Sequence, residues 1–96
     1  MRDEKAAAQD VATQALAHIA GDNEMCEQFL ANAGIDASQL RQAAHDPDFT
    51  VFVLDFVTAD DRRLLDFAQA ARLSPDRIMR ARTILAGPGS EGWSAD

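Results

Sequence analysis

The chain has 96 residues, of which 47% are hydrophobic and 26% are charged. This length suffices for one domain, and the composition is typical of a globular chain that can fill a core and stay in solution. The single cysteine, Cys26, excludes a secreted scaffold stapled by disulfides. The longest apolar run covers residues 51–54, far short of the ~20 residues that cross a bilayer. We therefore expect a cytoplasmic protein without membrane contact.

Charge is unevenly distributed around a formal net charge of -7. Residues 1–61 hold twelve acidic side chains against three basic ones, whereas residues 62–86 hold six arginines against two aspartates. The first segment disfavours contact with nucleic acid or with an anionic membrane surface. The second segment would tolerate either.

Helix signals divide the first half of the chain into three predicted helices. Residues 4–20 carry an apolar stripe on an alanine-rich background, which favours a helix. Asp22 can cap a second helix, and Gly34 supplies the left-handed residue that follows many helix ends. Asp36 opens a short third helix, with Gln39 placed to complete a capping box.

The fourth predicted helix, residues 47–58, is apolar on almost every side. Asp46 can cap it, and Pro47 suits its first position. Three of the five phenylalanines of the chain lie in it. Its apolar stripe at helical spacing consists of Phe49, Phe52, Val53, Phe56 and Val57. Such a helix must be buried by its neighbours, so we expect it to be the central element of the core.

Two more helices and a tail complete the prediction. Asp60 can cap a fifth helix, and Ser74 begins a sixth with proline at its first position. The glycine-rich residues 87–96 predict a flexible C-terminal tail after a single helical domain, residues 1–86. Trp93 in this tail is expected to dock on the surface of the domain, with a partner contact as the alternative. No segment alternates as a strand does, so the predicted fold is an all-α bundle of about six short helices.

An internal repeat relates the two halves of the chain. Displacing the sequence by 38 positions aligns residues 15–44 with residues 53–82. The apolar positions then coincide at helical spacing, and the capping residue Asp22 meets Asp60. We interpret the chain as two pseudo-repeated three-helix units packed around the helix at residues 47–58.

The strongest functional pattern spans residues 60–82. A DNA-reading helix-turn-helix needs a small residue in the first helix, a glycine in the turn and an aliphatic residue that locks the second helix. Ala71 and Ile78 meet two of these needs, whereas Arg72 stands where glycine is preferred. The equivalent segment of the first half has the same pattern with one arginine, so packing alone also explains it. The side chains that would contact nucleic acid or another anionic partner are Arg72, Arg77, Arg80 and Arg82.

No arrangement for catalysis or cofactor binding stands out. His18, Asp22 and Cys26 are spaced by four, which would stack possible zinc ligands on one face of a continuous helix. Gly21 interrupts that helix, and a fourth ligand is missing because His45 is the only other histidine. We therefore expect no catalytic residue, no cofactor and no metal.

Four segments carry a resemblance to a known family: residues 29–36, residues 40–49 with an Asp-Pro-x-Phe element, residues 53–56 with Leu-Asp-Phe, and residues 87–89. Together they resemble a bacterial family of short helical proteins classed as a domain of unknown function. The resemblance covers about Ala8 to Trp93. It implies a stand-alone, cytoplasmic, helical protein of about this length, and it implies no activity, ligand or catalytic residue.

Three functional hypotheses remain open at this point. The leading one is a non-enzymatic protein-interaction module that binds itself or a basic partner protein, because the first part of the chain is acidic. The alternative is a helix-turn-helix-like nucleic-acid binder that uses residues 60–82. The third is a small enzyme with no recognisable motif.

Overall fold

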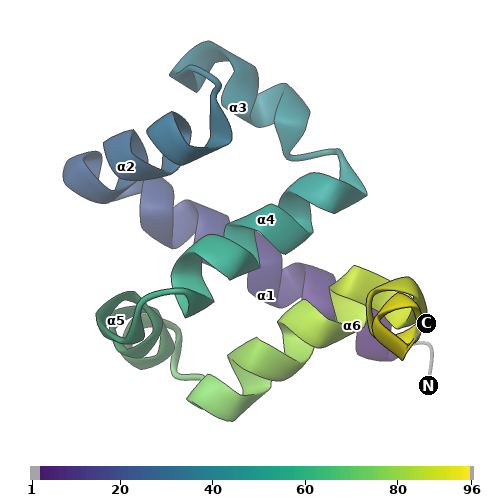
Figure 1. Cartoon of the computed structure of the whole chain (residues 1–96). Helices are drawn as coiled ribbons and strands as arrows, with labels where there is room; N and C mark the ends of the chain where they lie inside the picture. Colours follow the sequence, from purple (N-terminus) through teal and green to yellow (C-terminus); the bar gives the residue numbers. More distant parts are fainter. Residues whose placement is uncertain (1–2, 96) are drawn as a thin grey trace.

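The structure is a computed structural model that describes the backbone of residues 3–95 and the side chains of residues 4–46 and 48–87. Over that backbone the chain forms six helices and no strand (Figure 1), so the all-α prediction is confirmed. Their bounds are α1 Asp3–Ala20, α2 Asn23–Ala33, α3 Ala37–Ala43, α4 Pro47–Thr58, α5 Asp61–Ala71 and α6 Pro75–Ala95. The radius of gyration, 13.1 Å, matches the value of about 13 Å for a single domain of this length. Within the described range, no helix combines the length and the apolar character needed to cross a membrane.

Each aspartate predicted to cap a helix does so. Asp22, Asp36, Asp46 and Asp60 lie in extended backbone immediately before α2, α3, α4 and α5, and each side chain accepts a hydrogen bond from a first-turn N–H. At α3 the Gln39 side chain accepts in return from the backbone N–H of Asp36 at 2.9 Å, which completes the predicted capping box. These contacts satisfy N–H groups that have no partner inside the helix, so they fix where each helix starts.

The boundaries of α2 and α5 are offset by 38 positions at both ends, in the register of the predicted repeat. Packing does not follow that register throughout. Ile78 and Ala81 of α6 are buried, whereas α3, whose side chains are all described, has no buried residue. The two-unit repeat therefore stays an interpretation.

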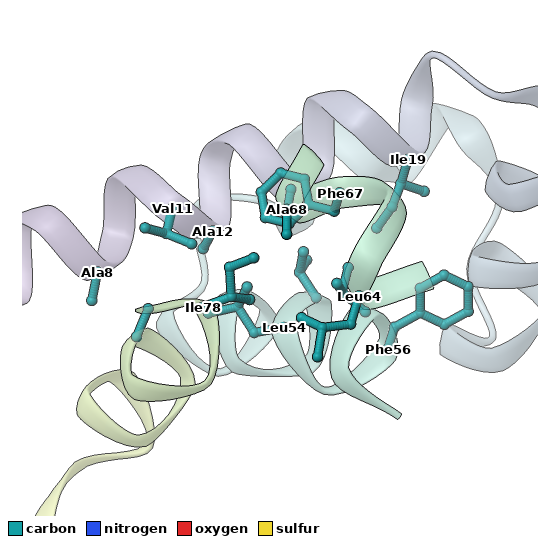
Figure 2. Close-up of a cluster of buried hydrophobic side chains, with 14 of the residues drawn as sticks. Ala8, Val11, Ala12, Ile19, Leu54, Phe56, Leu64, Phe67, Ala68 and Ile78 are labelled. Atoms are coloured by element: carbon teal, nitrogen blue, oxygen red, sulfur yellow. The ribbon is translucent and has the colours of Figure 1, made fainter. Parts of the chain in front are cut away.

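The core lies between α1, α4, α5 and α6, with Phe29 of α2 added to it. Figure 2 shows side chains of α1 on one side of this core, with Leu54 of α4 and Ile78 of α6 opposite. Most of the side chains that α1 contributes to the core are small, since Ala8, Ala12 and Ala15 are among its buried residues. Alanine lets neighbouring helices approach closely, so α1 is covered by both α4 and α6.

The apolar helix α4 is buried mainly in its second half. Val53, Leu54 and Val57 are fully buried and Phe56 is nearly so, whereas Phe49 and Phe52 are half-buried. Both half-buried rings pack against Phe29, with centroid separations of 5.6 and 5.5 Å. The prediction that this helix is enclosed on almost every side is thus correct only for its C-terminal half, because α3 lies outside the core.

The last helix continues beyond its predicted end. The bounds of α6 are Pro75–Ala95, with a non-helical residue at Gly87 (φ 80°, ψ 170°) where two helical segments join. Helical backbone therefore continues into the segment predicted as a tail, and the break at Gly87 falls where that tail was predicted to begin. Glycine permits the positive φ, and Pro88 suits the first turn of a helix that restarts there. The contacts of Trp93 lie outside the described side chains, so its docking and the flexibility of residues 87–96 stay predictions.

Candidate interaction groove

A groove of about 360 Å³ lies between the first turns of α1 and the middle of α6. We call it the α1/α6 groove. It is lined by Glu4, Ala7, Ala8, Val11, Arg77, Arg80, Ala81 and Ile84. Its volume is near the lower end of the range of known ligand sites, and it opens to solvent along the helix pair.

The floor of the α1/α6 groove is apolar and fixed by the core. Ala8, Val11 and Ala81 line it and are at least nine-tenths buried. In Figure 2, Ala8 and Val11 project from α1 toward the neighbouring helices. Since alanine fills little space, a hollow is left where larger side chains would close the gap between α1 and α6. The floor therefore cannot be altered at these buried positions without disturbing the core.

Among the described side chains, three charged ones lie on the rim of the groove. The Arg80 guanidinium of α6 reaches across to the Glu4 carboxylate of α1, with Nη2 and Oε2 3.0 Å apart. Both side chains are well exposed, at 70% and 63% of their surface, so this ion pair contributes little to stability. The Arg77 guanidinium is exposed as well, and among the described side chains it forms no ion pair or hydrogen bond. Counted over the described side chains, the rim thus has one positive charge in excess.

A second hollow, of about 220 Å³, lies between the first turns of α2 and α5 and has a mainly polar lining. One of its residues, Arg63, has its guanidinium 3.9 Å from the Phe56 ring centroid and donates a hydrogen bond to the Phe56 carbonyl at 2.5 Å. These contacts tie α5 to α4. We read this hollow as part of the helix junction, since its capping aspartates and Arg63 already have structural partners.

The structure divides the four arginines predicted to contact an anionic partner. Arg77 and Arg80 lie together on the rim of the α1/α6 groove. Arg82 forms an ion pair with Asp55 of α4 instead, so it faces another side of α6. Arg72 ends α5 in the left-handed conformation, at φ 60°. The arginines that a helix-turn-helix would use therefore lie on different sides of α5 and α6. Their contact with a partner stays a prediction.

The spacing of His18, Asp22 and Cys26 has a structural role. The His18 ring packs on Phe67, with centroids 5.4 Å apart, and its Nε2 atom is buried without a hydrogen-bond partner in the described part of the chain. Asp22 is occupied as the cap of α2. Among the described residues, no group of three or more His, Cys, Asp or Glu side chains could hold a metal ion.

The half of the α1/α6 groove contributed by α1 was not identified from the sequence. Helical periodicity predicts an apolar stripe along residues 4–20, but it does not say that α1 and α6 lie side by side. The available signal was the excess of alanine at the start of α1, at residues 6–8. A run of alanines favours a helix, and because the side chains are small it also leaves space beside that helix. It is this space that forms the groove.

Comparison with known proteins was made by family model, by curated relatives and by solved structures. A family model described as "Protein of unknown function (DUF3572)" matches residues 5–88. The chain belongs to this family. The match covers all but one of the residues that line the α1/α6 groove, and it confirms the resemblance to a family classed as a domain of unknown function. No curated protein and no solved structure matches the chain. The bacterial origin of this DUF3572 protein stays a prediction.

Proposed function

We propose that this DUF3572 protein is a non-enzymatic, cytoplasmic helical module that acts through protein contacts, and that the α1/α6 groove is its contact surface. The observation that carries the proposal is the combination of a preformed apolar floor with Arg77, whose guanidinium forms no ion pair or hydrogen bond with the described residues. Apolar floors with a polar rim are typical of protein contact sites. The partner is another protein or a second copy of the chain.

The shape of the groove favours binding over catalysis. An active site usually combines an enclosed pocket with several convergent polar groups of suitable chemistry. The α1/α6 groove is open, and its three charged side chains lie on the rim rather than on the floor. An enzyme therefore remains the third hypothesis.

Nucleic-acid binding through residues 60–82 is the alternative function. The position of Arg82 gives it less support, because its guanidinium forms an ion pair with Asp55 on another side of α6, away from Arg77 and Arg80. Mobility-shift titration with duplex DNA at low salt tests it. Binding that weakens with added salt and is lost in the double variant Arg77→Ala, Arg80→Ala would favour the alternative, and no shift at low salt would end it.

Affinity capture from the native cell tests the leading proposal. Ala7 lines the groove and is exposed, so Ala7→Trp should fill the groove without entering the core. Ala17→Trp is the matched control, because Ala17 is an exposed alanine of the same helix outside the groove. We expect Ala7→Trp to lose a protein that the parent and Ala17→Trp both retain. If all three recover the same proteins in the same amounts, the groove is not the contact surface.

A further inference from the structure

We propose that the ligand of the α1/α6 groove is an acidic amphipathic helix of a partner protein. This inference rests on the proposed function and names the chemistry of the partner. The length of the groove, the small side chains that line it and the charge of its rim support this ligand.

The length of the groove suits a helix. On α1 its lining begins at Glu4 and ends at Val11, and on α6 it begins at Arg77 and ends at Ile84. Each edge therefore spans eight residues, a rise of about 10 Å or two helical turns from the first to the last. A bound helix presents apolar side chains along one face at i, i+3, i+4 and i+7, which cover about the same length. The groove can thus take one such set of anchors.

The floor allows close approach by the backbone of a partner helix. Three of the lining residues are alanines, whose side chain is a single methyl group: Ala7, Ala8 and Ala81. Ala8 and Ala81 are also buried, which holds them in place. Large anchors from a partner would fill the hollow that these alanines leave. Helix packing into a groove of this kind buries apolar surface without rearranging the host.

The rim selects the charge of the partner. The Arg80 guanidinium is already paired with Glu4 across the groove, whereas the guanidinium of the exposed Arg77 forms no ion pair among the described residues. A carboxylate beside the anchors would pair with Arg77 and could also compete with Glu4 for Arg80. A lysine or arginine there would face like charge instead. The groove edge on α6 belongs to residues 62–86, whose local charge is positive although the whole chain is acidic.

Two peptide probes test the inference on the full chain. Both are amphipathic helices of about four turns with leucine at i, i+3, i+4 and i+7. One carries glutamate at every flanking position and the other carries lysine. We expect fluorescence anisotropy to show that the parent protein binds the glutamate peptide roughly threefold or more tightly than the lysine peptide, since each exposed ion pair contributes modestly.

Charge reversal at the rim makes the test specific. The Arg77→Glu variant should bind the two peptides equally or bind the lysine peptide more tightly. The control Arg41→Glu makes the same charge change on the exposed side of α3 and should keep the parent preference. Circular dichroism would show that both variants are folded. Equal binding of both peptides to the parent, no binding of either, or equal effects of Arg77→Glu and Arg41→Glu would each overturn the inference.

The outcome is separate from that of the proposed function. If capture depends on the groove but the parent does not prefer the glutamate peptide, the contact surface stands and the acidic-helix ligand is wrong. If capture does not depend on the groove, the proposed function fails whatever the peptides do. Recovery of a second copy of the chain in a groove-dependent manner would replace the acidic helix with self-association.

Discussion

Two residues in left-handed backbone conformation end α2 and α5, and they differ in chemistry. Gly34 has φ 74° and Arg72 has φ 60°. Both helices then close with a backbone hydrogen bond to the last turn, from Ile35 to the Leu30 carbonyl and from Leu73 to the Ala68 carbonyl. Glycine adopts this conformation freely, whereas a residue with a Cβ atom pays a steric cost. The sequence signalled the end of α2 clearly, but that of α5 only through the comparison with the first half.

Replacing Arg72 by glycine should therefore stabilise the fold. We expect Arg72→Gly to raise the free energy of unfolding by about 0.5–1 kcal/mol, because it removes the strain of the left-handed conformation. Thermal denaturation should show a midpoint higher by a few degrees. Gly34→Ala is the reciprocal change and should lower the midpoint. A lower midpoint for Arg72→Gly would mean that contacts of the arginine side chain outweigh the strain.

At the scale of elements, the helix starts could be predicted and the packing could not. Aspartate caps act through neighbouring backbone groups, so Asp22, Asp36, Asp46 and Asp60 marked four helices by local chemistry. Burial depends instead on which helices meet. For that reason the apolar pattern of α4 did not show that its first half is only partly covered, since α3 lies outside the core. In the same way, the alanines of α1 did not show that a groove lies beside them.

The uneven burial of α4 predicts unequal effects of two similar substitutions. Phe56 is nearly buried and Phe52 is half-buried. We expect Phe56→Ala to destabilise the protein by about 3–5 kcal/mol, which removes much of the stability of a domain this small. Phe52→Ala should cost clearly less than Phe56→Ala, because less apolar surface is lost. Urea unfolding measures both, and equal costs would contradict the burial seen here.

The position of α3 outside the core predicts low local stability. None of its described side chains is buried, and its apolar residues are only half-covered. We expect its backbone amides to exchange with solvent faster than those of α1 and of the second half of α4. Native-state hydrogen exchange measures this helix by helix. Protection of α3 equal to that of α4 would show that another element covers α3 in solution, as a second copy of the chain would.

At the scale of the whole molecule, charge and shape separate the functional hypotheses. The chain is acidic overall, and its positive excess is confined to residues 62–86. A nucleic-acid binder usually presents a basic face over its whole contact domain. Here the fold sends Arg82 toward α4 and brings Arg77 and Arg80 to the rim of one apolar groove, beside α1. The arrangement is better suited to a helix with carboxylates than to a phosphate backbone.

The proposed contact surface of this protein is the α1/α6 groove. Amide chemical-shift mapping of the full chain, titrated with the glutamate peptide described above, tests it most directly. We predict that the largest changes fall on residues 4–11 and 77–84, which form the two edges of the groove. Changes centred on α3 and the first half of α4, or no changes at all, would contradict the claim.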